Sequence, residues 1–424
     1  MSSKPVLSSQ MRIDLDANAT TPVLPQVLEA MQPFWFERHG NPSSAHQSGQ
    51  RTRAAVEHAR TAVASLLHCA PKEIVFTSGG TESDNLALSG ILQPWLDHHE
   101  PAHLITTKIE HHAVLFAAES LERRGSDPSR GGEANALLEV TYLNPDSNGV
   151  INPADVEAAM RPHTKLVSVM LANNETGAIQ PVGKIARIAK AHGALVHTDA
   201  VQAAGKLPLD LSGELKNVDL LSISGHKMYA PQGTGALFVR KGIELAPLFL
   251  GGPHERQRRA GTENVPGIVG LGRAAELATA WLEGQDHQLL TNRPAAQTPG
   301  SQSPAELIAR RSHFERRLLA LVPGATINCS GAPRISNTIN LRIDGIEAET
   351  LLMALDLQGI STSSGSACMS GANESSHVLL AMGLTPAQAG SSLRLSLSRL
   401  TTDEELDYAL EVIPAVVARM RTVS

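Results

Sequence analysis

A glycine turn directly follows a short apolar segment in Ile74-Val75-Phe76-Thr77-Ser78-Gly79-Gly80-Thr81-Glu82-Ser83, and a helical pattern opens after it at Asp84. From Glu73 to Arg240, short β-branched runs alternate with helical patterns in the same way. Such alternation is typical of a parallel sheet whose strands are joined by crossover helices. The sequence therefore predicts an α/β fold with a mostly parallel sheet. The expected strands are Ile74–Thr77, His103–Thr107, Leu137–Leu143, Leu166–Leu171, Ala194–Thr198, Leu220–Ile223 and Ala236–Val239.

Two domains are expected, because 424 residues exceed what one hydrophobic core usually supports. Past Gly267 the pattern changes to longer helices with fewer strands, which indicates a second unit of α+β type. We assign residues 27–281 to a large α/β domain. Residues 1–26 and 282–424 are assigned to a smaller α+β domain.

Local signals refine this division. Thr402 followed by Glu405 predicts a capping box that opens the last helix, and Pro181 is expected in the first turn of another. Residues 125–134 and 284–303 are rich in glycine, proline, serine and glutamine, so we interpret both as surface insertions.

The composition excludes several classes of function. A net charge of −6, with 42% hydrophobic and 18% charged residues, offers no basic excess for binding nucleic acid. The cysteines Cys69, Cys329 and Cys368 are too few and too scattered for a disulfide framework or a metal cluster, which indicates a reducing compartment and no metal site. Met1–Gln10 lacks the pattern of a secretory signal, and no run is long enough to span a bilayer. A cytoplasmic protein without membrane contact is therefore expected.

The glycine turn Ser78–Ser83 has the features of an anion site. It exposes backbone N–H groups at the start of a helix, where the helix dipole favours a phosphate. It matches neither the dinucleotide fingerprint nor the P-loop. A turn of this kind can also serve only to connect a strand to a helix.

A carboxylate and a lysine follow two later strands. Asp199 comes directly after Ala194–Thr198, at the sheet edge where open α/β folds bind ligands, although Asp is also a favoured N-cap residue. Lys227 lies in Ser224-Gly225-His226-Lys227, just after Leu220–Ile223. Most lysines are solvated surface charges, but one held against a sheet edge can lose its proton and form an imine with a carbonyl cofactor. Phosphate turn, carboxylate and lysine together match the needs of pyridoxal phosphate, whose phosphate, ring nitrogen and aldehyde each require a partner.

These residues belong to a longer series of motifs that resembles the cysteine desulfurases of iron–sulfur cluster assembly, which are fold-type I pyridoxal phosphate enzymes. The resemblance runs nearly from end to end, and so many motifs in one order make a chance similarity implausible. The motifs are Leu15-Asp16, Ala19-Thr20-Thr21-Pro22, Gly40-Asn41-Pro42-Ser43-Ser44, Thr77-Ser78-Gly79, Thr81-Glu82-Ser83-Asp84-Asn85, Glu110-His111, Asn173-Asn174-Glu175-Thr176-Gly177, His197-Thr198-Asp199-Ala200, the lysine motif, Arg259-Ala260-Gly261-Thr262 and Ser364-Gly365-Ser366-Ala367-Cys368.

The resemblance implies roles for the residues at matching positions. Lys227 would bind the cofactor covalently, Asp199 would pair with the protonated pyridine nitrogen, and His111 would stack on the ring and act in acid–base catalysis. Thr262 would contact the phosphate of the neighbouring subunit of a homodimer. Arg394 would hold the substrate carboxylate together with Asn174, which is also an implied cofactor contact. The remaining implied contacts are Gly80, Thr81, Ser224 and His226 at the phosphate and Gln202 at the ring oxygen.

Several of these residues have a plainer interpretation. His111 is followed by His112, and either could be a loop histidine at the surface. Arg394 lies in an alternating stretch, Leu393-Arg394-Leu395-Ser396-Leu397, whose polar face would ordinarily meet solvent. Cys69 and Cys329 are interpreted as small hydrophobes in or beside the core.

Cys368 is the cysteine for which we expect chemistry. It lies in Ser361–Gly371, a run of small residues that cannot build much core, and an exposed thiol is suited to nucleophilic attack. The resemblance implies that Cys368 takes sulfur from L-cysteine as a persulfide, leaves L-alanine, and passes the sulfur to a protein acceptor such as an iron–sulfur scaffold or a sulfur carrier. The alternatives are a related pyridoxal phosphate lyase or aminotransferase, for example a selenocysteine lyase, and a pyridoxal-binding protein without turnover.

Overall fold

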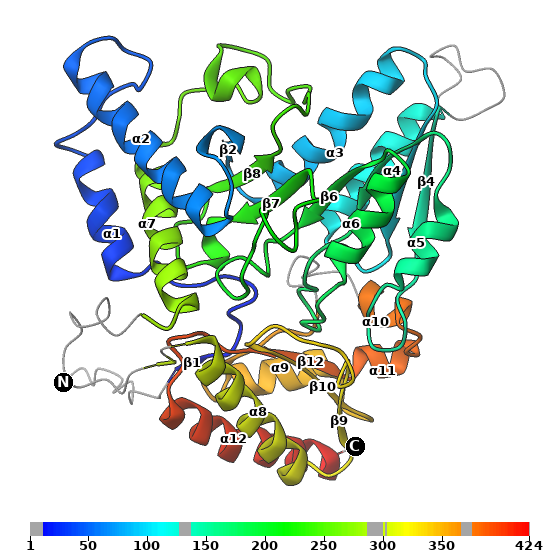
Figure 1. The fold of residues 1–424 in the computed structure, drawn as a ribbon. Coiled ribbons are helices and arrows are strands. Elements are labelled where there is room, and N and C mark those ends of the chain that lie inside the picture. Colours follow the sequence, from blue (N-terminus) through cyan, green and yellow to red (C-terminus); the bar gives the residue numbers. More distant parts are fainter. Residues whose placement is uncertain (1–11, 127–136, 286–299, 302, 366–374, 424) are drawn as a thin grey trace, which may run out of the picture.

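A seven-stranded sheet lies at the centre of the larger part of the molecule (Figure 1). The computed structural model describes residues 12–126, 137–285, 300–301, 303–365 and 375–423. Within them the strand order across this sheet is β2-β8-β7-β6-β5-β3-β4. The strands are β2 (Ile74–Thr77), β3 (Ala102–Thr107), β4 (Leu138–Leu143), β5 (Thr164–Ser168), β6 (Leu195–Asp199), β7 (Leu220–Ser224) and β8 (Gly235–Val239). Each strand predicted from the sequence is therefore present, with ends that differ by a few residues at most.

Strand β8 is the exception to the parallel arrangement. It runs antiparallel to both of its neighbours, β2 and β7, whereas the pairs from β7 to β4 are parallel. The link from β7 to β8 holds only the short 3-10 helix Gly225–Lys227 and a turn. Such a link allows an antiparallel return but is too short for the crossover that a parallel pair requires. The predicted mostly parallel sheet is confirmed, with one antiparallel strand inside it.

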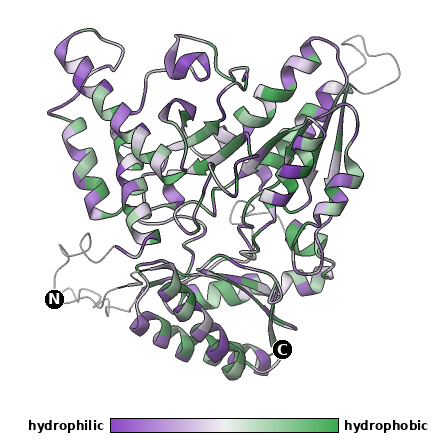
Figure 2. Cartoon of the chain, viewed as in Figure 1, coloured by the Kyte–Doolittle hydropathy of each residue, from purple (hydrophilic) through white to green (hydrophobic). Residues whose placement is uncertain are grey.

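Helices cover both faces of this sheet (Figure 1). Successive residues of β3 show the division, because Leu104 packs in one core with α3 and α4 while Ile105 packs in another core on the opposite face. The first face is covered by α3 (Gly80–Asp97) and α4 (His112–Gly125), and the second by α1 (Pro25–Met31), α2 (Gln47–Leu66), α5 (Pro153–Ala159), α6 (Val182–Ala191) and α7 (Val265–Leu282). In Figure 2 the covering helices carry both hydrophobic and hydrophilic residues, as amphipathic helices do.

A separate hydrophobic core lies in the C-terminal part. It is built on an antiparallel sheet of order β12-β10-β9, beside the parallel pair β1 and β11. Ile13 and Leu15 of the N-terminal arm and Trp281 at the end of α7 are buried in the same core. The elements of this core are β1 (Ile13–Asp14), β9 (Ala325–Ile327), β10 (Thr338–Ile343), β11 (Ile360–Ser361), β12 (Ser392–Ser396), α8 (Pro304–Leu321), α9 (Ala348–Asp356) and α12 (Asp403–Val423). The short helices α10 (His377–Ala381) and α11 (Pro386–Gly390) pack instead in the core that holds Ile105.

The structure tests the predicted capping box, the predicted helix start at Pro181 and, in small part, the predicted insertions. Thr402 N–H donates to Glu405 Oε2 at 2.8 Å and Glu405 N–H donates to Thr402 Oγ1 at 3.3 Å, so the capping box before α12 is confirmed. Pro181 is the N-cap of α6, one residue earlier than expected. Most of the two predicted insertions, 125–134 and 284–303, lies outside the described residues. No described helix combines the length and the apolar character needed to cross a bilayer.

Candidate active site

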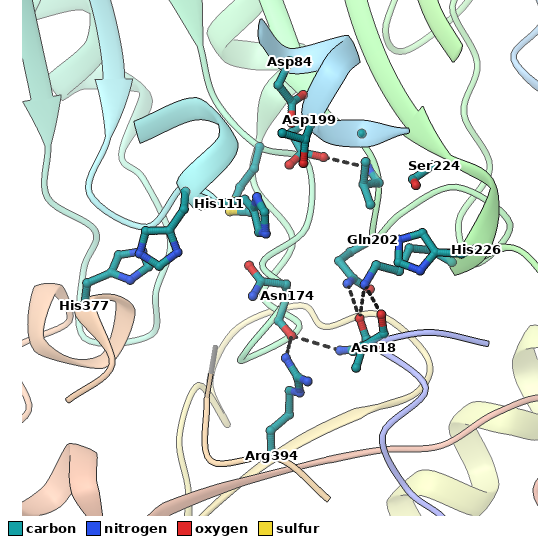
Figure 3. A pocket seen from close by; sticks show the side chains of 17 residues that line it. Asn18, Asp84, His111, Asn174, Asp199, Gln202, Ser224, His226, His377 and Arg394 are labelled. Carbon is teal, nitrogen blue, oxygen red and sulfur yellow. Dashed lines mark hydrogen bonds between the residues drawn. The ribbon is translucent and has the colours of Figure 1, made fainter. Parts of the chain in front are cut away.

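A cavity of about 220 Å³ lies at the carboxyl edge of the large sheet (Figure 3). Asp199 at the end of β6 and Ser224 at the end of β7 line it, and Asn18 of the N-terminal arm and Arg394 of β12 line it from the C-terminal unit. This edge is where open α/β folds bind ligands. Of the residues singled out from the sequence, those that line the cavity are Gly80, Thr81, His111, Asn174, Asp199, Gln202, Ser224, His226, Lys227 and Arg394.

The glycine turn after β2 forms one end of the cavity. Gly80 and Thr81 are the first residues of α3, so the positive end of the helix dipole lies at the cavity wall. Gly80 leaves no space for a side chain, since a Cβ atom there would lie 2.7 Å from Val201 Cγ2. Gly79 has a φ of +155°, a backbone conformation that residues with a side chain rarely adopt. The turn is thus shaped by its glycines into an anion-binding cradle.

Lys227 ends the short 3-10 helix that follows β7. Its Nζ donates hydrogen bonds to the carbonyl oxygens of Asn18 and Ala19, each at 2.6 Å. The N-terminal arm therefore positions the amine in the cavity, which no pattern in the sequence indicated.

Two carboxyl groups lie close together at another end of the cavity (Figure 3). Asp199 Oδ1 accepts a hydrogen bond from the N–H of Val201 at 2.8 Å, so this side chain caps a turn as well as lining the cavity. Burial, and next the carboxylate of Asp84, raises the pKa of Asp199 to about 7. Burial raises the pKa of Asp84 to about 7 as well. The pair therefore titrates near neutral pH, and a cation beside Asp199 would favour its charged form.

His111 is the N-cap residue of α4 and lines the cavity. Its Nδ1 accepts a hydrogen bond from the N–H of Ala113 at 3.1 Å, so the neutral ring carries its proton on Nε2. Burial, and next the charge of Lys227, lowers the pKa of His111 to about 4. The side chain is thus a neutral imidazole in the cavity wall at pH 7, and its interpretation as a surface loop histidine is wrong.

Arg394 offers the cavity a guanidinium group. It is 2% exposed, and every residue of β12 is buried, so the expectation that its polar face meets solvent is wrong. Nη2 donates to Asp16 Oδ1 at 2.7 Å. Nη1 donates to the carbonyl oxygen of Asn174 at 3.2 Å (Figure 3). Nε is buried and has no hydrogen-bond partner among the described residues. A buried donor without a partner is suited to a ligand carboxylate.

Comparisons with known proteins agree with this geometry. The family model for aminotransferase class-V matches residues 13–292 and 300–409. Cysteine desulfurase 2 from Trichormus variabilis is 44% identical over 97% of this chain and 94% of its own length. Cysteine desulfurase IscS from Methanosarcina thermophila is 43% identical over 99% of this chain and 95% of its own. The chain belongs to the aminotransferase class-V family, among the cysteine desulfurases.

Solved structures have the same fold as this chain. A NifS-like protein aligns with a TM-score of 0.82 at 37% identity, covering 96% of this chain and 100% of the other. The structure of SspA in complex with cysteine aligns with a TM-score of 0.75 at 34% identity, covering 92% and 100%. The prediction of a fold-type I enzyme is thereby confirmed.

Pyridoxal phosphate is the cofactor of this family and of this chain. The residues present fit it, because the cavity combines an anion-binding cradle at Gly80, the carboxyl pair Asp84–Asp199 and the amine of Lys227. Phosphate, pyridine nitrogen and aldehyde are the cofactor groups that such partners suit.

Thr262, which the cysteine desulfurase motifs singled out, is not in the cavity wall. Thr262 is exposed and lines a separate hollow near Arg53, so its role toward a second subunit stays a prediction. Cys368 lies outside the described residues. The chain that precedes it is described as far as Gly365, and Ser363 pairs with Arg394 beside the cavity.

Several cavity residues of this desulfurase were assigned no role from the sequence. They are Asn18, Ala19, Asp84, His112, Met170, Val201 and His377. Asp84 stands four positions after Gly80 on α3, and Leu88, four further on, is fully buried, so a carboxylate on the sheet-facing side of this helix was the available signal. Asn18 contributes its backbone carbonyl oxygen, which no side-chain pattern could indicate.

Proposed function

We propose that this chain is a pyridoxal phosphate-dependent cysteine desulfurase that converts L-cysteine to L-alanine and transfers the sulfur to its own Cys368. The observation that carries the proposal is that one cavity is lined by the Lys227 amine, the Asp199 carboxyl group and the Arg394 guanidinium group. The identity of 44% to a cysteine desulfurase over nearly the whole chain supports it, and so does the likeness to a protein solved in complex with cysteine.

The cofactor would lie with its phosphate at the glycine cradle and its ring between His111 and Asp199. Burial, and next the charge of Lys227, lowers the pKa of His226 to about 4, so that His226 would meet the phosphate as a neutral hydrogen-bond donor. The proposed contacts are Gly80, Thr81, Ser224 and His226 for the phosphate, Gln202 for the ring oxygen, Asp199 for the ring nitrogen, His111 for the ring face and Asn174 beside it.

The substrate carboxylate would bind Arg394. The guanidinium is held by Asp16 and by the carbonyl oxygen of Asn174, which fixes its plane before the substrate arrives. Its Nε–H remains to donate to a carboxylate oxygen, and a charge-assisted bond of this kind is stronger than one between neutral groups. Preorganisation of this kind lowers the cost of ordering the site on binding.

Lys227 is the proposed base. Bound pyridoxal phosphate supplies an electron-withdrawing ring that stabilises negative charge on the substrate Cα. Lys227 would remove the Cα proton, and Asp199 would hold the proton at the ring nitrogen. His111 keeps a neutral ring with a proton on Nε2, so it would donate a hydrogen bond rather than act as a cation.

Sulfur transfer would follow at Cys368. Its thiolate attacks the substrate sulfur, so that a sulfur–sulfur bond forms while the carbon–sulfur bond breaks. The electron pair of the broken bond passes to the carbon skeleton, which takes up protons to become alanine. The enzyme thiol leaves this step as a persulfide. Delivery of that sulfur to an acceptor protein, such as an iron–sulfur scaffold or a sulfur carrier, completes the cycle.

Alanine and sulfide release from L-cysteine in the presence of a thiol reductant tests the proposal. Cys368→Ser should keep the bound cofactor and lose about a hundredfold or more of the sulfide release, because the nucleophile is gone. Cys69→Ser is the matched control and should keep wild-type turnover, since burial raises the pKa of the Cys69 thiol to about 12 and leaves it protonated. Full activity in Cys368→Ser would contradict the proposal.

We further propose a cytoplasmic homodimer whose cofactor sites are completed by Thr262 of the neighbouring subunit. Exposed Phe249 and Leu250 support this, because they lie in the loop before Thr262 and Arg259 stacks over Phe249. We also infer that 27–281 forms the large domain, and that 1–26 and 282–424 form the small one. The separate core around β10 supports this division.

A further inference from the structure

Lys206 is a buried lysine, and lysine is seldom buried in proteins. It lies in the turn after β6 and is 8% exposed. A buried lysine is usually paired with a carboxylate. Within the described chain, however, the Nζ of Lys206 donates its hydrogen bonds to Gln202, to the carbonyl oxygen at 3.1 Å and to Oε1 at 3.2 Å. An amine in this position needs an explanation beyond packing.

The contact with Lys206 fixes the orientation of the Gln202 amide. The oxygen and nitrogen ends of an amide have nearly the same shape, so the surrounding hydrogen bonds decide which end points where. A lysine ammonium can donate but cannot accept. The end of Gln202 that faces the charged amine is Oε1, and the carbonyl oxygen of Asn18, which can only accept, requires Nε2 at the other end. The N–H end is left to point away from Lys206.

The N–H end of Gln202 lies on the cavity side. Nε2 donates to the carbonyl oxygen of Asn18 at 2.9 Å, and both residues line the cavity (Figure 3). That same carbonyl oxygen also accepts a hydrogen bond from Lys227. Gln202 thus places a donor beside the amine of Lys227, and Lys206 supports it from behind.

The charge of Lys206 also interacts with ionisable residues that line the cavity. Burial, and next the charge of Lys227, lowers the pKa of Lys206 to about 7. Lys206 in turn contributes to the lowered pKa of His226. The ionisable groups that interact with this amine are therefore Lys227 and His226, both in the segment after β7. An anion bound near Gln202 would favour the charged form of Lys206.

We propose that Lys206 is a positioning residue that acts through Gln202, whose amide it holds with the N–H toward the cavity so that the site binds an oxyanion on the cofactor ring. The inference rests on the proposed function, which assigns the ring oxygen of pyridoxal phosphate to Gln202. It extends that function by a residue outside the cavity wall. Its consequence is selectivity, because loss of Lys206 weakens the binding of a ring only when that ring carries the oxygen.

Two cofactor analogues separate this role from a structural one. Both lack the aldehyde and so cannot join Lys227 covalently: 4-deoxypyridoxine phosphate keeps the ring oxygen, and its 3-deoxy counterpart lacks it. Calorimetric titration of the apoenzyme measures the dissociation constant of each. Lys206→Met should weaken the binding of 4-deoxypyridoxine phosphate about tenfold, as expected when a charge-supported hydrogen bond is lost. The dissociation constant of the 3-deoxy analogue should change less than about twofold.

Further variants complete the experiment. Lys206→Arg keeps a charged donor and should retain most of the affinity, and Lys216→Met at an exposed lysine should bind both analogues like the wild type. Combining Lys206→Met with Gln202→Ala should be no worse than Gln202→Ala alone, because the two residues act in series. If Lys206→Met does not fold, Lys206→Gln, which is uncharged and too short to reach Oε1, should show the same selective loss.

Two results would overturn the inference. Equal weakening of both analogues would assign Lys206 a general electrostatic or structural role, and unchanged binding of both would assign it none at this site. Failure of the proposed function is distinguishable from either result, because wild-type enzyme would then release neither alanine nor sulfide from L-cysteine, whereas the binding of the two analogues does not depend on turnover.

Discussion

At the scale of single residues, the cavity separates its charges. The carboxyl pair Asp84–Asp199 lies at one end and the Arg394 guanidinium at the opposite end, with His111 between them (Figure 3). The imidazole of His111 is neutral at pH 7 because burial lowers its pKa to about 4. A ligand with a cationic ring at one end and a carboxylate at the other would be oriented by this field. The pyridinium of the cofactor and the carboxylate of cysteine have that polarity.

Lys227→Ala tests the residue that would bind the cofactor covalently. The variant should lose the visible absorption of the lysine-linked cofactor and all measurable turnover, because Lys227 is the lysine that lines the cavity. Absorption spectra and sulfide release measure both effects. Lys216→Ala, at an exposed lysine, should behave like the wild type. A variant that still fixed the cofactor to protein on borohydride reduction would contradict the assignment.

Asp84→Asn tests the electrostatics of the carboxyl pair. A carboxyl group whose folded pKa is raised to about 7 stabilises the fold fully below its unfolded pKa and loses that contribution as the pH rises through 7. In the apoenzyme, Asp84→Asn should therefore raise stability at pH 8 by about 1 kcal/mol or more, which is roughly 1–2 °C in the melting temperature for a chain of this length. At pH 4 the gain should vanish. Thermal unfolding at both pH values measures it.

Asp356→Asn, at an exposed carboxylate, is the control for this experiment and should not alter the pH dependence of unfolding. The titratable groups that face Asp84 are Asp199, Glu110 and His197, so the pH midpoint of the stability change reports the whole cluster. An Asp84→Asn variant that is destabilised equally at pH 4 and pH 8 would show that the carboxyl group is needed for packing instead.

At the scale of elements, the loop that carries Thr262 is tied to the glycine turn. Arg60 pairs with Glu255 through two hydrogen bonds of 2.8 Å, and Glu255 Oε2 also accepts the N–H of Phe76 in β2 at 3.0 Å. Glu255 has a φ of +45°, a conformation that costs energy for a residue with a side chain. The buried ion pair holds this strained segment against the strand that leads to the anion cradle.

Arg60→Met should therefore be strongly destabilising. Removing one partner leaves Glu255 buried without its counter-charge, which costs about 3–5 kcal/mol. Urea unfolding measures the loss. Arg273→Met is the matched control, because the Arg273–Glu276 pair is about one third exposed on each side and such surface pairs contribute less than about 1 kcal/mol. A loss in Arg60→Met no larger than in the control would contradict the role of the pair.

The sequence predicts the elements well and their connections less well. The strands around Asp199 were predictable because strands buried on both faces are short apolar runs. The direction of β8 was not, since it depends on the length of the link from β7 and not on the residues of β8 themselves. The same limit holds for Arg394, because alternation along β12 cannot reveal that the fold buries this strand on both faces and brings Arg394 to the cavity.

The candidate site likewise contains residues that were predictable from the sequence and residues that were not. Lys227 and Asp199 were predictable because they follow strands at one edge of a parallel sheet. Asn18 and Lys206 were not, because one acts through its backbone and the other through a neighbouring side chain. Long-range contacts of this kind leave no periodic signal in the sequence.

At the scale of the whole molecule, the N-terminal arm joins the two units at the cavity. The Asn18 side chain donates to Thr338 Oγ1 of β10 at 2.8 Å and to the carbonyl oxygen of Asn174 at 3.1 Å. Its own carbonyl oxygen accepts from Lys227 and Gln202. One residue thus contacts the small sheet, the substrate end and the cofactor end of the site. We expect motions of the small unit to reach Lys227 through it.

If the active site is shared across a homodimer, two inactive variants should restore activity when their subunits are mixed. Subunits with Lys227→Ala retain Thr262, and subunits with Thr262→Glu retain Lys227 but would present a carboxylate to the neighbour's phosphate. Each homodimer should be inactive, whereas a mixed dimer should have one intact site. Random exchange of equal amounts should restore about a quarter of wild-type activity. Sulfide release measures the recovery, and native mass spectrometry measures the exchange. Lys227→Ala mixed with a double variant that carries both changes must stay inactive. Absence of recovery despite complete exchange would show that each chain completes its own site.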